Sequence, residues 1–467
     1  METEIALYPT LTPIIHSWVE NFLKDSDQIH DLFKKYGSPI NILSPEPFLE
    51  NFQAYKEVLE SHGLDHLVCF ARKANKGTTF VKAARDHGFG VDTASYRELE
   101  QCLDLGVNPK KIVLTASIKN INLLELAVSN DVLIIVDNQD ELDQIEQVAL
   151  ELGQTAKIGI RIGGFEVNGH KLYTRFGFDI DNVLNIMLER VYPSEQLNFK
   201  GFHFHLNGYS IDQRAKALTQ TIALIDKLGK YNINTTFIDI GGGLLINYLE
   251  NEDEWNLFKN ELKLAVQGAR DPITFQNDGL GYQMIDDELC GELKTYPYFN
   301  KKNKAAFLND ILSYPTHRGT IGSLLKDRNI SLRLEPGRSL LDQCGITISK
   351  VVFRKYDSQN NLLIGLDMNK TQLYSSSADF LLDPIVINQH STEYNEPTSG
   401  YFVGAYCLEQ DVILKRKINL EKVPEIGDIV CFVNTAGYMM HFYETEAHLF
   451  QLATNLSLLN TGELKED

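Results

Sequence analysis

The sequence has little of what marks secreted, membrane-spanning or zinc-stabilised proteins. Its 467 residues include six cysteines with no Cys-x-x-Cys pair, so we expect reduced thiols and no metal site. No apolar run approaches the roughly 18 residues that span a bilayer. The acidic N-terminus, Met1-Glu-Thr-Glu, is unlike a secretory signal. We therefore expect a cytoplasmic protein with no membrane partner.

Positive charge is also scarce. The chain has 44 Lys and Arg against 63 Asp and Glu, which gives a formal net charge of −19. Nucleic acids and anionic membranes bind surfaces with a positive field, so neither is expected as a partner. The hydrophobic share of 43% is typical of a globular chain, and the length favours two domains.

From about residue 39, apolar runs of strand length alternate with segments of helical period, which is typical of β-α repeats around a parallel sheet. Eight such repeats predict a closed (β/α)₈ barrel of the TIM type, whose functional groups gather where the strands end. The expected strands are Leu67–Phe70, Gly90–Asp92, Lys111–Thr115, Val132–Val136, Lys157–Ile162, Gly201–His205, Phe237–Ile240 and Ile330–Leu334.

Three other parts are expected around this barrel. Residues 1–38 predict an N-terminal arm that docks on a β domain, and residues 39–334 the barrel, with an insertion at about 250–325 that could act as a lid. Residues 335–467 predict a C-terminal β-barrel or sandwich domain with a final helix near Glu444–Leu456. The β segments expected there are Ile346–Phe353, Leu362–Leu366, Tyr401–Val403 and Ile429–Val433.

Polar or glycine-rich groups follow most of the expected barrel strands. Each has an ordinary structural explanation: an exposed loop lysine, a core histidine, a tight glycine turn, or an ion pair between Glu335 and Arg333. Because all of these groups occur at the ends of successive strands, separate structural explanations for each of them become improbable. The groups are Lys73, Asp92, Arg161, His203 with His205, Gly241-Gly-Gly243, and Glu335 with Arg338.

This set of groups predicts a pyridoxal phosphate site. A triple glycine at a strand end lets an anion approach the backbone, and Arg338 could add a fixed charge. A partly desolvated Lys73 would bind the cofactor aldehyde, Glu335 would keep the pyridine nitrogen protonated, and His205 would stack on the ring. The first strand lacks the Gly-x-Gly-x-x-Gly of a dinucleotide fold, so a nicotinamide cofactor is not expected.

The ordered motifs resemble the fold-type III pyridoxal-phosphate decarboxylases, which include the diaminopimelate, ornithine and arginine decarboxylases. The similarity covers nearly the whole chain. It runs through Phe70-Ala-Arg-Lys-Ala-Asn75, Gly90-Val-Asp-Thr-Ala-Ser95 with Glu98, Arg175-Phe-Gly177, His203-Phe-His205, Gly241-Gly-Gly243, Glu335-Pro-Gly-Arg338, Tyr406-Cys-Leu-Glu-Gln-Asp411, Gly427-Asp428 and Ala436-Gly-Tyr438.

The resemblance implies roles for individual residues. Lys73 would be the cofactor lysine, and Cys407 would return a proton after CO₂ leaves. Cys407 and Tyr438 would serve the barrel of the partner subunit, so the resemblance implies a homodimer with shared sites. The cofactor site implied in this way contains Lys73, Asp92, Arg161, His205, Gly241, Gly242, Gly243, Glu335, Gly337, Arg338 and Tyr438.

The sequence departs from the family pattern at three places. Leu206-Asn-Gly-Tyr-Ser210 replaces the usual Gly-Ser after the stacking histidine, so Asn207 or Ser210 would contact the phosphate. Leu408 stands where an acidic residue usually follows the cysteine, and residues 366–374 lack the arginine of diaminopimelate decarboxylases. These departures disfavour diaminopimelate and ornithine.

The substrate expected instead is an ornithine-like amino acid with a bulky acyl group. The resemblance points first to N-citrylornithine in siderophore biosynthesis. The alternatives are decarboxylation of free ornithine, lysine, arginine or diaminopimelate, a racemase with the same cofactor, and a non-catalytic relative that binds the cofactor.

Overall fold

The computed structural model describes residues 8–375, 380–388, 396–459 and 461–467 and divides into two compact units. The barrel unit contains Phe48–Leu245 and Lys302–Leu340. The β unit contains Met1–Pro47, Ile246–Lys301 and Leu341–Asp467, although its first seven residues, which belong to the predicted arm, lie outside the described part.

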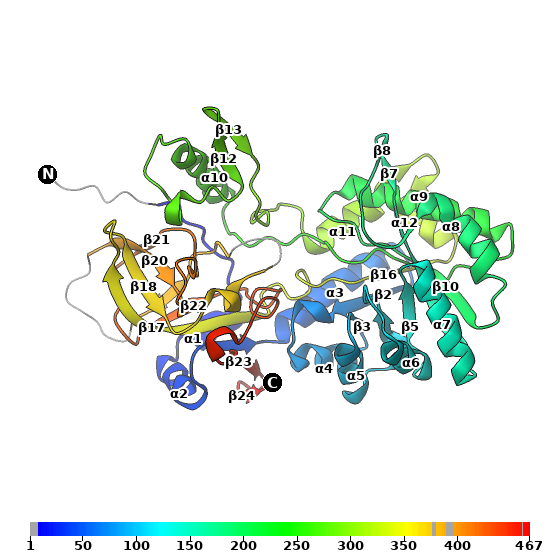
Figure 1. Cartoon of the computed structure of the whole chain (residues 1–467), viewed down its shortest axis with the longest axis horizontal. Coiled ribbons are helices and arrows are strands. Elements are labelled where there is room, and N and C mark those ends of the chain that lie inside the picture. The colour runs from blue at the N-terminus through cyan, green and yellow to red at the C-terminus, as the bar shows by residue number, and fades with distance from the viewer. Residues whose placement is uncertain (1–7, 376–379, 389–395, 460) are drawn as a thin grey trace. The chain divides into compact units, whose positions relative to one another are not determined.

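The barrel unit is a closed parallel barrel with helices around it (Figure 1). Each strand pairs with the next, β10 pairs with β6, and β16 pairs with β2, which closes the ring. All eight expected strands are present, so the predicted (β/α)₈ barrel is confirmed. They are β2 (His66–Ala71), β3 (Gly90–Thr93), β4 (Ile112–Leu114), β5 (Leu133–Val136), β6 (Ala156–Gly163), β10 (Leu197–His203), β11 (Phe237–Asp239) and β16 (Ser331–Leu334).

Local signals in the sequence set the ends of the surrounding helices. The Asn138 side chain accepts from the Glu141 N–H at the start of α7, and Gly153 ends that helix with φ 61°. Gly88 ends α4 in the same left-handed conformation. The barrel helices are α3 (Glu46–Ser61), α4 (Thr78–His87), α5 (Tyr96–Asp104), α6 (Ile121–Ser129), α7 (Gln139–Leu152), α8 (Ile180–Ile186), α9 (Ile211–Gly229), α11 (Lys304–Leu312) and α12 (Ile321–Asp327).

The inside of the barrel is filled by large side chains set against glycines. Phe237 packs with Val113, Leu133 and Ile135 in a buried cluster. A Cβ on Gly201 would lie 2.3 Å from the Phe237 carbonyl oxygen, so only glycine leaves room for this strand pairing. The packed interior leaves the carboxyl ends of the strands as the place for a site.

The β unit is built on a nine-stranded sheet that contains all four of the expected β segments. Its strand β1 (Ile40–Leu43) pairs with β17 and β23, so these residues belong to this sheet and not to the barrel. The remaining strands of the sheet are β17 (Gly345–Tyr356), β18 (Leu362–Leu366), β19 (Ile385–Ile387), β20 (Thr398–Val403), β21 (Ile418–Leu420), β22 (Ile429–Phe432), β23 (Thr454–Leu458) and β24 (Leu464–Glu466).

The predicted final helix near Glu444–Leu456 is wrong. The structure has only a single 3₁₀ turn, η6 (Ala447–Leu449), followed by strand β23. Residues 454–457 pair with β1, a partner more than 400 positions earlier in the chain. A pairing between segments this far apart outweighs the local helical pattern, and it leaves no trace in the local sequence.

The segment between β11 and α11 is shorter than the predicted insertion. Residues 246–301 group with the β unit, and they include α10 (Glu252–Val266) and the hairpin of β12 (Tyr282–Ile285) and β13 (Glu288–Gly291). Residues 302–325, which the prediction also placed in the insertion, belong to the barrel unit. Their two helices precede β16, as barrel helices do.

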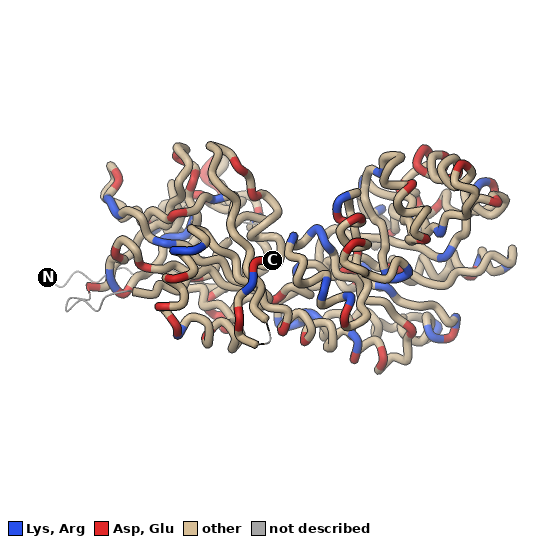
Figure 2. The backbone as a smooth tube through the Cα atoms, turned by 90° about the horizontal axis from the view of Figure 1, so that it is seen from below, with Lys and Arg blue, Asp and Glu red and all other residues tan. Residues whose placement is uncertain are grey.

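Two features of the described residues bear on partners. None of their helices combines the length and apolar character needed to cross a membrane. Figure 2 shows Lys and Arg interspersed with Asp and Glu along both units, without one continuous basic stripe in that view.

Candidate active site

Buried polar side chains line the carboxyl ends of the barrel strands. Their burial requires that each one find a hydrogen-bond or charge partner within the protein. The set contains three residues predicted from the sequence to bind the cofactor, together with four others. These residues are Asp92, Thr115, Asp137, Arg161, His203, Asp239 and Glu335.

Lys73 lies in a 3₁₀ turn, η1 (Arg72–Ala74), directly after β2. Its Nζ is 2.7 Å from Asp92 Oδ2; the lysine side chain is 36% exposed and that of Asp92 only 1%. Burial, followed by the negative charge of Glu335, raises the pKa of Asp92, while the Lys73 charge opposes this shift. The Thr115 hydroxyl donates to the other Asp92 oxygen. The carboxylate therefore holds the lysine amine at the open end of the barrel.

Arg161 is one hydrogen bond further along the same network. It donates to Asp137 Oδ1 at 2.8 Å and to the Thr115 carbonyl oxygen at 2.6 Å. Thr115 in turn contacts Asp92. Arg161 thus links three neighbouring strand ends and fixes the residue that holds Asp92, a role that no motif in the sequence indicated.

The glycine turn after β11 brings the backbone against His205 and Glu335. Gly241 and Gly243 have φ of 64° and 74°, a region that favours glycine. A Cβ on Gly241 would lie 2.5 Å from His205 Nδ1, and one on Gly242 would lie 2.7 Å from the Glu335 carbonyl oxygen. The N–H of Gly242 donates to His205 Nδ1 at 3.2 Å. Only glycine allows this close approach.

His205 is neutral at physiological pH. Burial within the protein and then the Lys73 charge lower its pKa to about 3. Although more than a third of the residue is exposed, a pKa below the usual range leaves the ring without charge at pH 7.

Arg214 is a functional candidate that the sequence analysis missed. This residue of α9 is fully buried, and its guanidinium donates to the carbonyl oxygens of Gly208, Ser210 and Gly242. Burial lowers its pKa to about 10, so it remains charged at neutral pH. It ties the loop after His205 to the glycine turn. No local signal indicates this role, because the contact with Gly242 spans 28 positions.

The other predicted residues divide between the two units. Gly337 and Arg338 follow β16 and are buried, Asn207 is exposed, and Ser210 caps α9 by accepting from the Gln213 N–H. Cys407 and Tyr438 lie in the β unit. Cys407 is an exposed free thiol, and Tyr438 has a φ of 74°, which is strained for a residue with a side chain.

Comparison with known proteins decides the family. A family model described as "Pyridoxal-dependent decarboxylase, pyridoxal binding domain" matches residues 46–277. The chain belongs to the pyridoxal-dependent decarboxylases. It is 30% identical over 460 residues to "Uncharacterized protein y4yA" of Sinorhizobium fredii, covering 97% of this chain and 95% of that protein.

Two further comparisons involve diaminopimelate decarboxylases. The protein of that name from Aquifex aeolicus is 29% identical over 430 residues, which covers 88% of this chain and 84% of the relative. The crystal structure of the Helicobacter pylori diaminopimelate decarboxylase complexed with L-lysine matches with a TM-score of 0.69 at 21% identity, over 94% of this chain and 95% of that one. The latter similarity supports the fold.

This pyridoxal-dependent decarboxylase uses pyridoxal 5′-phosphate to decarboxylate an amino acid, and the barrel residues fit that cofactor. The fit rests on the chemistry of the donors: a lysine amine held at the rim, a buried carboxylate at Glu335, and a turn where any Cβ would fill the space beside His205. Which residue contacts which part of the cofactor stays a prediction.

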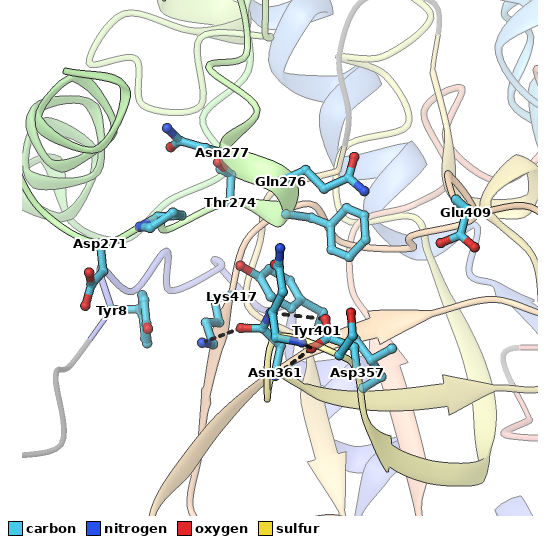
Figure 3. Close-up of a pocket in the computed structure, with 15 residues that line it drawn as sticks. Tyr8, Asp271, Thr274, Gln276, Asn277, Asp357, Asn361, Tyr401, Glu409 and Lys417 are labelled. Atoms are coloured by element: carbon cyan, nitrogen blue, oxygen red, sulfur yellow. Dashed lines mark hydrogen bonds between the residues drawn. The ribbon is translucent and has the colours of Figure 1, made fainter. Parts of the chain in front are cut away.

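The β unit of the decarboxylase contains a separate hollow of about 780 Å³ (Figure 3). Lys417 donates to Asn361 at 3.2 Å and lies over the rings of Tyr8 and Tyr401. Glu409 lines the same hollow. None of the residues predicted to bind the cofactor lines it, so it lies outside the predicted cofactor site.

The contacts of Arg214 give a testable prediction for the decarboxylase. We expect Arg214→Leu to weaken pyridoxal phosphate binding about tenfold or more, because three carbonyl oxygens lose their donor and the loop separates from the glycine turn. Titration of the cofactor-free protein measures the dissociation constant. Lys216→Leu, on the same helix, breaks only contacts with Asp212 and Asn168 away from the glycine turn, and it serves as the control. Equal affinities for the two folded variants would contradict the role of Arg214.

Proposed function

We propose that this decarboxylase removes the α-carboxylate of an ornithine-like amino acid carrying a bulky acyl group, with N-citrylornithine in siderophore biosynthesis as the first candidate. The observation that carries the proposal is the Lys73–Asp92 pair at the barrel rim, 2.7 Å long and next to Glu335 and the glycine turn. It offers an amine to bind the cofactor aldehyde and a carboxylate to orient that amine.

Each surrounding residue has one task in this proposal. Glu335 accepts a hydrogen bond from the pyridine nitrogen, His205 stacks on the ring, and Asp92 and Arg161 hold the rim in place. The phosphate is bound by Gly241, Gly242, Gly243, Gly337, Arg338 and Tyr438, with Asn207 or Ser210 in place of the usual serine.

Bound pyridoxal phosphate supplies an electron sink for the α-carbon. The bond from that carbon to the carboxylate breaks, and CO₂ leaves. The Cys407 thiol then gives its proton to the α-carbon, so that the product is an amine. During proton transfer the protein has to exclude other proton donors. Before it, the protein has to keep the bond between the α-carbon and the carboxylate aligned for cleavage.

The surroundings of Cys407 support a substrate without a free distal ammonium. The next residue is Leu408, an apolar side chain that is 59% exposed. The acidic residue nearest to Cys407 in the sequence is Glu409, which lines the hollow with Lys417 and Tyr401 (Figure 3). An ammonium group such as that of ornithine or lysine would need a carboxylate beside the thiol, whereas an acyl group would not.

Incubation with a panel of amino acids tests the substrate. The panel contains ornithine, lysine, arginine, diaminopimelate and acylated ornithines including N-citrylornithine, with mass detection of CO₂ loss. We expect kcat/KM for an acylated ornithine to exceed that for any free amino acid by about a hundredfold. The charged distal group of a free amino acid would leave water without gaining a partner in the site. Preference for a free amino acid would replace the proposed substrate. Racemisation without CO₂ loss would overturn the decarboxylase assignment.

We also propose that the active enzyme is a homodimer with shared sites. The two groups assigned to chemistry, Lys73 and Cys407, lie in different compact units of the chain, and the thiol is exposed. An exposed acid is a poor proton donor for a carbanion, because water competes with it. A partner subunit that covers Cys407 would remove this competition.

Mixing two inactive variants tests the shared site. Lys73→Ala and Cys407→Ala should each lose most activity alone. If the sites are shared, random reassociation of equal amounts should restore about one quarter of wild-type activity, since half the dimers contain one intact site. Lys76 is an exposed neighbour of Lys73. In the control mixture, Lys76→Ala is combined with Cys407→Ala in place of Lys73→Ala. Activity that fails to rise on mixing, while the proteins exchange subunits, would contradict shared sites.

A further inference from the structure

Three buried side chains meet at the ends of β10, β11 and β16. His203, Asp239 and Glu335 are 1%, 0% and 3% exposed, and one nitrogen or oxygen atom from each side chain lies within 4.8 Å of those from the other two. Bulk water cannot hydrogen-bond to groups buried this deeply, so their hydrogen-bond partners have to lie within the protein. Of the three, only Glu335 has a role in the proposed function, as the acceptor for the pyridine nitrogen.

Three atoms in this cluster have no hydrogen-bond partner among the described residues. They are Asp239 Oδ2, Glu335 Oε1 and His203 Nδ1. The other Asp239 oxygen accepts from the Gly241 N–H at 2.9 Å, and His203 Nε2 lies between the two Glu335 oxygens, 3.3 Å from Oε2 and 3.2 Å from Oε1. Asp239 and Glu335 can form a hydrogen bond with each other only when one of the two carboxyl groups carries a proton, because two ionised carboxylates have no donor.

The surroundings decide which carboxyl group carries that proton. Burial, followed by the charge of Glu335, raises the pKa of Asp239 well above its usual range. Burial and the charge of Arg161 lower the pKa of His203, so its ring is neutral and has one N–H to donate. That N–H points to Glu335, whereas Asp239 Oδ2 receives no donor from the described residues, so the shared proton is assigned to Asp239.

We propose that Asp239 is a positioning residue, held as a neutral acid whose Oδ2–H donates to the Glu335 carboxylate. Glu335 then accepts from both Asp239 and His203, which together orient its carboxylate. The same Asp239 side chain anchors the glycine turn through Gly241. The use of Glu335 in catalysis rests on the proposed function, but the shared proton is a property of the protein alone.

The other titratable groups around Asp239 come from β16 and from the ends of three further strands, β2, β3 and β6. Arg333 is its paired neighbour across β11 and β16 and stacks on the Phe237 ring at 3.9 Å. An ionised Asp239 would need Arg333 as its counter-charge, which is the competing account. The remaining groups are Cys69, Lys73, Asp92 and Arg161.

Two substitutions separate the accounts. Asp239→Asn keeps an acceptor for the Gly241 N–H and a neutral donor for Glu335, so we expect pyridoxal phosphate affinity and kcat within about threefold of wild type. Asp239→Ala removes both contacts, and we expect the affinity to fall about tenfold or more. Asp92→Asn is the matched control: because Asp92 acts as an anion beside Lys73, the same change there should be damaging.

Infrared difference spectra of the cofactor-free protein give a readout independent of activity. Wild type minus Asp239→Asn should show the carbonyl stretch of a protonated carboxylic acid at neutral pH. Absence of that band, or equal damage from Asn and Ala in folded proteins, would overturn the proposal in favour of an ionised Asp239. A stoichiometric metal ion in the purified protein would also overturn it. Failure to bind pyridoxal phosphate in wild type would instead reject the proposed function.

Discussion

Burial of charge at one end of the barrel is the constraint on which the site depends. The polar side chains at the strand ends are shielded from water, so each of them is held by a neighbour on the next strand. Asp92 holds Lys73, Thr115 holds Asp92, and Arg161 holds both the Thr115 backbone and Asp137. The Lys73 amine, which we propose binds the cofactor, is therefore placed by a network that spans several strands, and its position depends on the closure of the barrel.

The same constraint explains how one short glycine turn can serve a cofactor. Gly241 to Gly243 leave space where a side chain would collide with His205, Glu335 or Arg214. The turn is held on three sides, by Asp239 through a backbone N–H, by Arg214 through a carbonyl oxygen, and by Glu335, whose N–H donates to the Gly241 carbonyl. A rigid turn of this kind lowers the entropic cost of binding an anion. The acid pair of Asp239 and Glu335 extends the network beneath it.

Sequence reasoning succeeded where the signal is local and periodic. The alternation of apolar runs predicted all eight barrel strands, and it placed Lys73, Asp92 and Glu335 at strand ends, where the structure has them. It failed where distant segments meet. Ile40–Leu43 joins the β unit through strands 300 and more positions later, and the same pairing takes residues 454–456, the end of the expected helix, into a strand. Arg214 and Asp239 were missed because their importance lies in partners that a linear pattern does not show.

The central claim is that Lys73 is the residue to which the cofactor is attached. Borohydride treatment of the cofactor-loaded protein, followed by proteolysis and mass spectrometry, tests it directly, because reduction fixes the cofactor on the lysine that holds it. The account predicts one labelled peptide, containing Lys73, and loss of the label in Lys73→Ala. Labelling of another lysine, or a loaded protein in which no lysine becomes labelled, would contradict it.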